Sequence, residues 1–483
     1  MNNKRAVVSG FTWMFGERIV AQAINLLISI ILARILLPDD YGIIAIVSVF
    51  IEIFNVFISN GFGSALIQKK DADQLDFSTI FYTSIIFCLM LFSLIFMIAP
   101  CLAKLYDNQL IMHVLRVMAL RIPVAGVYTV QQAYVFKTLK FKKTFLSTLI
   151  GSLISAVIGI YMANAGYGVW ALVSQHLVYS ILSMLVLSII SGWHPQARFS
   201  ICRLRHMLPF SLRILLSSVI DETYNQLRSF VIGYKYSAVD LAYYNKGVQF
   251  PSLVVTNVNT TINNVLFPVL SGEQDSIIRV KEITQKAIKI CSYLMFPLLI
   301  GLLIVAEPFI LLILTEKWES SIIYLQIMCI AYMLTPINSA NLQAIKAIGR
   351  ADIVLKLEIA KKIVGALAIL FSMRYGVLAV AWSMVIVSII TSFINAFPNK
   401  KLLNYGYVEQ IYDIVPNLIP SVIMGFVVYV IGKAIEPSFI KLFVQAAVGV
   451  IIYLSLSLIF RNKAFYILIN IIKSTISSKK NAY

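Results

Sequence analysis

The feature that most constrains this chain is a pair of long apolar stretches, residues 8–34 and 42–67, on either side of a short break at 38–42. A helix that crosses the hydrocarbon core of a bilayer needs about 20 mostly apolar residues. Both stretches reach that length, so they predict a hairpin of two membrane-spanning helices. The pattern continues along the chain and predicts fourteen spans, with approximate bounds 8–34, 42–67, 77–103, 108–136, 144–165, 168–192, 207–235, 241–270, 284–306, 320–347, 352–373, 376–398, 412–433 and 438–460.

The composition agrees with a membrane protein and argues against a soluble one. Hydrophobic residues make up 59% of the chain, and the mean hydropathy is +0.85. Charged residues make up 13%, whereas soluble domains carry about 25%. The net charge of +18 does not indicate a nucleic-acid partner, because the excess Lys and Arg lie in short loops. The five cysteines are scattered without a CxxC motif, so no metal site and no cofactor are predicted.

The basic residues predict the orientation of the chain in the membrane. They are concentrated in alternate loops, and such loops normally face the cytoplasm. We therefore predict that both termini are cytoplasmic. The N-terminal residues contain no small-residue cleavage site, so we do not expect a signal peptide to be removed. The loops and ends predicted to lie inside carry Lys4, Arg5, Lys69, Lys70, Lys137, Lys140, Lys142, Lys143, Arg198, Arg203, Arg205, Arg279, Lys281, Lys286, Lys289, Lys346, Arg350, Lys400, Lys401, Arg461, Lys463, Lys473, Lys479 and Lys480.

An internal repeat predicts how the spans are grouped. Gln132-Ala133, a basic loop and Tyr167-Gly168-Val169 correspond to Gln343-Ala344, Arg350 and Tyr375-Gly376-Val377. Chance similarity between apolar sequences is the alternative. The repeat predicts two parallel copies related by an axis along the membrane normal. The expected fold class is an all-α integral membrane protein of about 14 transmembrane helices. It consists of two pseudo-symmetric six-helix lobes (1–197 and 198–399), two peripheral helices (400–461) and a basic cytoplasmic tail (462–483).

Several spans carry polar side chains at helical spacing. Arg18, Gln22 and Asn25 share one face of the first span, and Glu52 and Asn55 share one face of the second. Polar residues inside a membrane normally face a protein interior or a water-filled cavity. Hydrogen bonding between helices is the alternative. The candidates for a central, substrate-binding cavity are Arg18, Gln22, Asn25, Glu52, Arg116, Arg121, Asp221, Asn225, Arg228, Lys246 and Asn257.

The balance of charge in the candidate cavity favours an anionic ligand. The cations Arg18, Arg116, Arg121, Arg213, Arg228 and Lys246 outnumber the acids Glu17, Glu52, Asp221 and Glu222. Glu17 lies next to Arg18, so these two residues can also form an internal pair. The charges by themselves do not identify the ligand.

The stretches LARILLPDDYGIIA (32–45) and NGFGSALIQKKD (60–71) resemble those of the polysaccharide exporters of the multidrug/oligosaccharidyl-lipid/polysaccharide superfamily. Wzx-type flippases are the most similar, and the resemblance covers roughly residues 7–460. It implies a flippase that moves a polyprenyl-diphosphate-linked oligosaccharide of O-antigen, capsule or exopolysaccharide across the bacterial plasma membrane by alternating access. It also implies contact with membrane lipid and with a polysaccharide polymerase complex.

Three rival functions remain open at this point. A cation-coupled antiporter of drugs or organic ions, from the same superfamily, would favour an acidic cavity. A membrane enzyme acting on polyprenyl-linked sugars would need a sizeable outer loop, and the predicted outer loops are all short. No Walker A, HExxH or GxSxG motif occurs, so we expect no enzyme. A non-transporting scaffold of the polymer-assembly complex can be distinguished only by a transport assay.

Three of four further local features have two interpretations, and Pro123 has one. His176 fits a packed histidine better than a proton relay, and Asp39-Asp40 fits a turn and helix cap better than a metal site. Pro123 predicts a kink in the fourth span. The last two spans, 412–433 and 438–460, fit either packing against the lobes or a groove for a lipid tail.

Overall fold

A computed structural model describes residues 2–59, 62–435 and 438–470, and before Val20 it describes little beyond the backbone. Within these residues the chain is almost entirely helical and forms no strand. Eleven of the described helical stretches are long and apolar enough to cross a membrane. The expectation of a multi-pass, all-α membrane protein is therefore confirmed.

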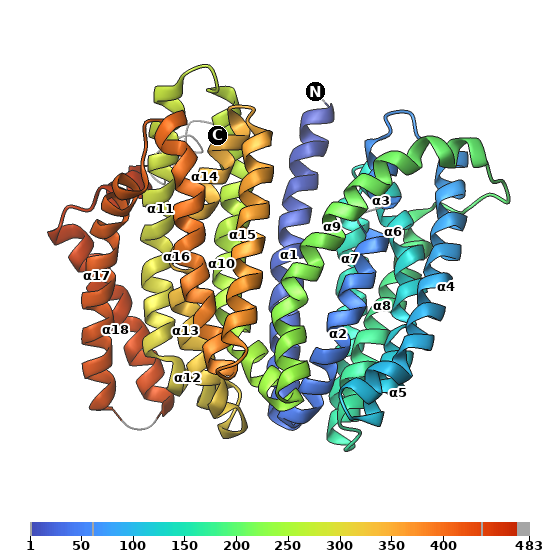
Figure 1. Ribbon diagram of the computed structural model, residues 1–483, viewed down its shortest axis with the longest axis horizontal. Helices are drawn as coiled ribbons and strands as arrows, with labels where there is room; N and C mark the ends of the chain where they lie inside the picture. Colours follow the sequence, from blue (N-terminus) through green and yellow to red (C-terminus); the bar gives the residue numbers. More distant parts are fainter. Residues whose placement is uncertain (1, 60–61, 436–437, 471–483) are drawn as a thin grey trace. The chain divides into compact units, whose positions relative to one another are not determined.

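The chain divides into two compact units, residues 1–242 and 243–483. Unit 1 contains nine α-helices among its described residues, which Figure 1 shows in blue to green. They are α1 (Asn2–Ile35), α2 (Pro38–Ser59), α3 (Phe62–Gln68), α4 (Gln74–Leu105), α5 (Gln109–Met118), α6 (Arg121–Lys137), α7 (Phe141–Asn164), α8 (Val169–Ser191) and α9 (Ile201–Lys235).

Unit 1 is a bundle in which α6 packs against α2, α4 and α8, and α7 packs along α8. The division at 242 comes later than the expected lobe boundary at 197, because α9 packs on α2 within this unit. Phe230 of α9 meets Phe50 of α2 edge to face, with ring centroids 6.2 Å apart. Gly42 lets the backbones approach closely: a Cβ there would lie 2.1 Å from the carbonyl oxygen of Ala238.

Unit 2 begins in the first turns of α10 and forms a second helical bundle. Here α11 packs against α13, α14 and α17, α16 packs against α13, α14 and α15, and α18 packs against α12 and α17. Its described helices are α10 (Ala238–Gly272), α11 (Ile277–Ile304), α12 (Ala306–Ile313), the 3₁₀ helix η1 (Glu316–Ser321), α13 (Ile322–Tyr332), α14 (Thr335–Ala347), α15 (Ala351–Ser372), α16 (Val377–Leu402), α17 (Tyr407–Lys433) and α18 (Ser438–Ile459).

One predicted span in each unit is broken near its middle. In unit 1 the break between α5 and α6 precedes Pro123, and in unit 2 the break between α13 and α14 precedes Pro336. Proline lacks an N–H group and clashes with the preceding turn, so it is tolerated best in the first turn of a helix. The kink expected at Pro123 is thus present, just upstream of the proline itself.

A segment of extended chain at 192–200 connects α8 to α9 and is held on the first turns of α4. Trp193 is buried, and its indole N–H donates to Gln74 Oε1 at 2.6 Å. The Gln74 amide in turn donates to the carbonyl oxygen of His194 at 2.7 Å. This connection is therefore a fixed part of unit 1.

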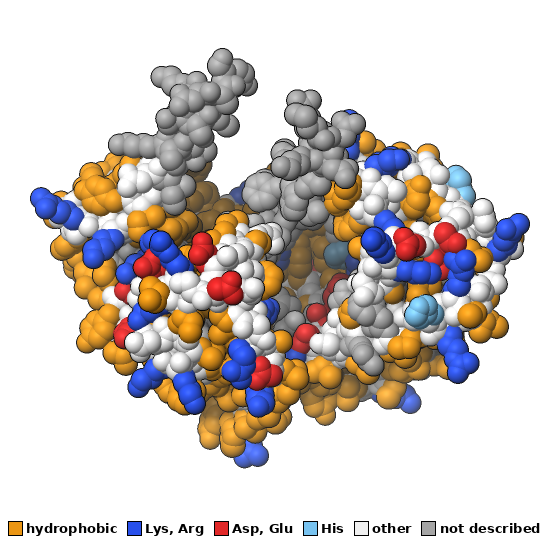
Figure 2. All heavy atoms as spheres, turned by 90° about the horizontal axis from the view of Figure 1, so that it is seen from above, with side chains coloured by type: hydrophobic (Ala, Val, Ile, Leu, Met, Phe, Trp, Pro, Cys, Tyr) orange, Lys and Arg blue, Asp and Glu red, His pale blue; other side chains and the backbone are white. Residues whose placement is uncertain are grey.

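Four charged residues form a cluster at the same end of unit 1. Asp76 is fully buried, 2.6 Å from Lys69 Nζ and 3.1 Å from Arg203 Nη1. Arg203 also contacts Asp73 at 2.5 Å, and Asp73 caps α4 through a bond from the Asp76 backbone N–H. Figure 2 shows basic and acidic side chains gathered on this end of the unit. We call Lys69, Asp73, Asp76 and Arg203 the charge cluster.

Buried polar groups hold α17 against the other helices of unit 2. Asn417 of α17 donates to Ser292 Oγ of α11 at 2.7 Å, and Asn462 donates to Asn417 Oδ1 at 2.8 Å. Asn341 of α14 and Gln410 of α17 exchange two amide hydrogen bonds of 2.7 and 2.9 Å. Buried amides are expensive unless paired, so these contacts specify where α17 docks.

Candidate functional site

Three helices of unit 1 bring together Glu52 of α2, Arg121 of α6 and Ser180 of α8. Arg121 is the first residue of α6, directly after the break in the fourth predicted span. Its Nη1 atom lies 3.9 Å from Glu52 Oε1, and its Nε donates to Ser180 Oγ at 3.2 Å. We call these three residues the Arg121 site.

The Arg121 site combines a largely buried guanidinium with a carboxylate, Glu52, that lies near it without a hydrogen bond. The Arg121 side chain is 16% exposed, and that of Glu52 is 42% exposed. A separation of 3.9 Å exceeds a hydrogen bond, so the carboxylate neutralises the guanidinium without binding it tightly. Glu52 also accepts a long bond of 3.4 Å from Asn55. An arginine held in this way can bind a phosphate group through two parallel hydrogen bonds.

The other candidates on α1 and α5 lie outside the Arg121 site, or their side chains lie outside the described part of the structure. Arg18 is in α1, but its side chain lies outside the described residues. On the same helix Gln22 is half-buried and Asn25 is exposed. Arg116 of α5 packs over the ring of Phe96, 4.2 Å from the ring centroid. The structure thus assigns Arg116 a cation–π contact with α4.

The polar stripe of α9 is largely accessible. Asp221 and Asn225 are exposed and Arg228 is half-buried. Beside the stripe, Gln226 donates to Glu222 Oε1 at 2.6 Å. Arg213 lies among the residues whose side chains are not described. That this stripe lines a cavity stays a prediction.

The two remaining candidates belong to unit 2. Lys246 of α10 is buried, donates to Gln249 Oε1 at 3.2 Å and lies 5.5 Å from the centroid of the Trp318 ring. Asn257 is exposed, and its amide donates to the Leu253 carbonyl of its own helix at 2.9 Å. That these residues share a cavity with those of unit 1 also stays a prediction.

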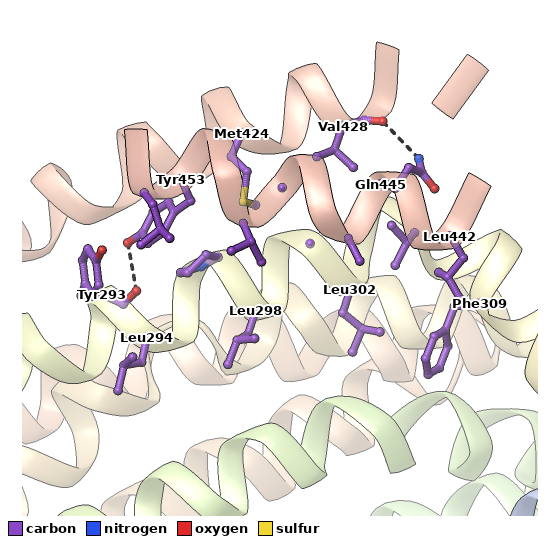
Figure 3. Close-up of a pocket in the computed structure, with 17 residues that line it drawn as sticks. Tyr293, Leu294, Leu298, Leu302, Phe309, Met424, Val428, Leu442, Gln445 and Tyr453 are labelled. Carbon is purple, nitrogen blue, oxygen red and sulfur yellow. Dashed lines mark hydrogen bonds between the residues drawn. The ribbon is translucent and has the colours of Figure 1, made fainter. Parts of the chain in front are cut away.

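An apolar pocket of about 580 Å³ lies between α11, α12, α17 and α18 of unit 2. Figure 3 shows aliphatic and aromatic side chains along its walls, with Gln445 bonded to the Val428 carbonyl at 3.1 Å and Tyr453 to the Tyr293 carbonyl at 2.9 Å. The lining residues are Tyr293, Leu294, Pro297, Leu298, Gly301, Leu302, Val305, Phe309, Met424, Val428, Leu442, Gln445, Ala446, Gly449, Val450, Tyr453 and Leu454. Such a pocket suits a hydrocarbon chain.

Two expectations about acidic residues can be compared with the structure. Asp40 Oδ2 accepts the backbone N–H of Leu37 at 3.2 Å, which agrees with a role in capping α2. No group of three or more potential metal ligands occurs within the part of the chain that the structure describes.

Sequence reasoning missed Ser180 and the charge cluster. Ser180 lies 59 residues beyond Arg121, so no local pattern joins the two. Asp73 and Asp76 did carry a local signal: an acid three residues after an N-cap Asp, before an apolar run, is typical of a capping box. From the sequence, Lys69 and Arg203 are predicted only to mark loops on the cytoplasmic side.

Comparison with known proteins identifies the family. The model of the polysaccharide biosynthesis protein family matches residues 31–323, more than half of the chain. The chain belongs to this family. The resemblance to polysaccharide exporters stated above is therefore confirmed.

Relatives in the polysaccharide biosynthesis family match most of the chain at low identity. The teichuronic acid biosynthesis protein TuaB of Bacillus subtilis (strain 168) is 24% identical over 83% of this chain and 84% of its own. The succinoglycan biosynthesis transport protein ExoT of Rhizobium meliloti (strain 1021) is 24% identical over 89% and 88%. The lipopolysaccharide biosynthesis protein WzxC of Escherichia coli (strain K12) is 22% identical over 88% and 89%.

A solved structure of the lipid II flippase MurJ, in an inward closed conformation, has the same fold. It superposes with a TM-score of 0.78 and 16% identity, and the match covers 94% of this chain and 99% of MurJ. At this identity the likeness concerns the fold alone.

Proposed function

We propose that this protein is a flippase that moves a polyprenyl-diphosphate-linked oligosaccharide across the bacterial plasma membrane by alternating access. Its relatives bear the names of biosynthesis and transport proteins for teichuronic acid, succinoglycan and lipopolysaccharide. The substrate would be a repeat unit of O-antigen, capsule or exopolysaccharide. Its hydrocarbon tail stays in the membrane, whereas its diphosphate and sugars need a polar path.

The Arg121 site is the observation that carries the proposal. It places a guanidinium at a break in a membrane helix, with its counter-ion too far away to occupy its N–H groups. Moving a diphosphate into a membrane interior is costly, and a fixed cation offsets that cost. Arg18 and Gln22 of α1 and Lys246 of α10 are further candidates for the path.

The alternative functions are less well supported. A drug or organic-cation antiporter of the same superfamily would be expected to centre on a carboxylate, whereas at the Arg121 site the arginine is the more deeply buried partner. The relatives are not named as enzymes, and we propose no catalytic step. A polymerase complex remains a proposed partner.

Deleting the gene tests the proposed function. We expect surface polysaccharide to be lost and the lipid-linked repeat unit to accumulate on the inner leaflet, with both effects reversed by the wild-type gene. Normal export by the deletion strain, or accumulation of an unlinked sugar precursor instead, would overturn the proposal.

The proposed architecture has fourteen spans, two six-helix repeats and two additional helices. The matched breaks before Pro123 and Pro336 support the repeat. So does equivalent packing, since α6 contacts α4 and α8 much as α14 contacts α11 and α16. In this arrangement the lobes are 1–197 and 198–399, followed by 400–461 and the basic tail 462–483.

Cysteine labelling checks the proposed topology with both termini in the cytoplasm. In a cysteine-free variant, single cysteines at Lys140, Lys286 and Lys400 are expected to resist a membrane-impermeant thiol reagent applied to intact cells. Cysteines at Asp107 and Glu319 are expected to react. Labelling of the Lys140 position from outside would contradict the fourteen-span arrangement.

The apolar pocket of unit 2 is proposed to hold part of the polyprenyl tail. Gly301 lines the pocket, and the nearest atom to a Cβ at this position is Met424 Cε at 4.0 Å. Gly301→Leu should therefore place its Cβ without a clash, extend the rest of its side chain into the pocket and reduce export severalfold at equal abundance. Gly272→Leu is the matched control, because a Cβ there meets nothing within 4 Å and lies outside the pocket. Equal export by both variants would contradict a tail site here.

A further inference from the structure

Ser180 of α8 makes two hydrogen bonds that together determine its role. Its Oγ donates to the carbonyl oxygen of His176, one turn earlier, at 2.9 Å. The same Oγ accepts from Nε of Arg121 at 3.2 Å. A serine hydroxyl has a single proton. Because that proton is used on His176, a lone pair of Ser180 is left to face Arg121.

The bond from Nε restricts the plane of the guanidinium. Arginine presents five N–H groups in a rigid fork. When Ser180 holds Nε, the two terminal nitrogens remain for a ligand. Glu52, 3.9 Å from Nη1, is not within hydrogen-bond distance of this end. The terminal edge is therefore oriented, and an oxyanion can bind it with two parallel bonds.

We infer that Ser180 is a positioning residue that orients Arg121 for the phosphate of the lipid-linked substrate. The inference rests on the proposed function. Ser180 itself need not touch the substrate. It lowers the entropy that the long arginine side chain would otherwise lose on binding, and so raises affinity through Arg121 alone.

A double-mutant cycle on purified protein tests this role, with geranyl diphosphate as a soluble probe and calorimetry as the measurement. Ser180→Ala is expected to weaken binding up to about tenfold, because the released Arg121 side chain would have to be immobilised when the probe binds. Ser180→Thr keeps the hydroxyl and should restore most of the affinity. In an Arg121→Lys background, which lacks Nε, Ser180→Ala should cause no further loss.

Ser174→Ala is the matched control on the same helix, because Ser174 Oγ donates to the Ala171 carbonyl of its own helix at 2.9 Å. It should bind the probe like the wild type. The inference is overturned if Ser180→Ala binds normally, or if its loss is the same in the Arg121→Lys background. Those results would leave the flippase proposal intact. If the wild type exports polysaccharide but does not bind the probe, both the phosphate role of Arg121 and the role of Ser180 are wrong.

Discussion

Arg121→Ala is expected to abolish surface polysaccharide export when it replaces the wild-type protein in a deletion strain. The change removes the cation of the Arg121 site and leaves Glu52 as an unopposed charge. A diphosphate would then meet a carboxylate where it needs a guanidinium. Arg121→Lys should retain part of the activity, because lysine keeps the charge but cannot make the planar, two-bond contact. Polysaccharide is measured at the cell surface, with membrane abundance checked by blotting.

Two controls separate a phosphate role from a structural one. Arg116→Ala removes a neighbouring arginine that packs over Phe96, and it should reduce export much less. If Arg121 served only to neutralise Glu52, the double change Glu52→Gln with Arg121→Gln would leave no orphan charge and should restore export. Restoration by that pair, or wild-type export by Arg121→Ala at equal abundance, would contradict phosphate binding.

The membrane helices could be predicted from the sequence because their signal is local. A run of about 20 apolar residues must satisfy its backbone polar groups within a helix when it lies in lipid. The breaks were less predictable, although Pro123 marked one of them. Grouping of α9 with unit 1 was not predicted, because it depends on side-chain contacts such as Phe50 with Phe230, which are remote in sequence.

The site could be predicted only in part, for the same reason. Arg121 and Glu52 stood out because charges are rare inside spans. Their pairing could not be derived, since stripes on separate helices do not show which faces meet. Lys246 and Asn257 were candidates by the same rule, yet Asn257 bonds to its own helix backbone. A polar residue in a span is thus a candidate for a binding site, and the packing of the helices decides whether it contacts a substrate or forms a hydrogen bond within the protein.

Asp76→Ala is expected to lower the free energy of unfolding strongly. The Asp76 side chain is fully buried and contacts both Lys69 and Arg203. Its removal takes the carboxylate partner from Lys69, leaves Arg203 with Asp73 alone, and also breaks the capping box of α4. Removing one partner of a buried ion pair costs about 3–5 kcal/mol. The lower end applies here, because the Lys69 and Arg203 side chains are 31% and 35% exposed. Thermal unfolding in detergent should show a large drop in Tm.

Asp352→Ala is the matched control for Asp76→Ala. Asp352 also pairs with an arginine, Arg350, at 2.9 Å, but both side chains are about half exposed, so the loss should be small. Equal shifts in Tm for the two variants would contradict the importance of burial.

The charge cluster also predicts a pH dependence of stability, because Arg203 lowers the pKa of Asp73 to about 2. A carboxyl whose pKa is lowered on folding adds stability above its unfolded pKa of about 4. That contribution should be lost as the pH falls from about 4 toward 2. Asp73→Asn should remove the part of the dependence that comes from Asp73, whereas the part from Asp352, whose pKa Arg350 also lowers to about 2, should remain.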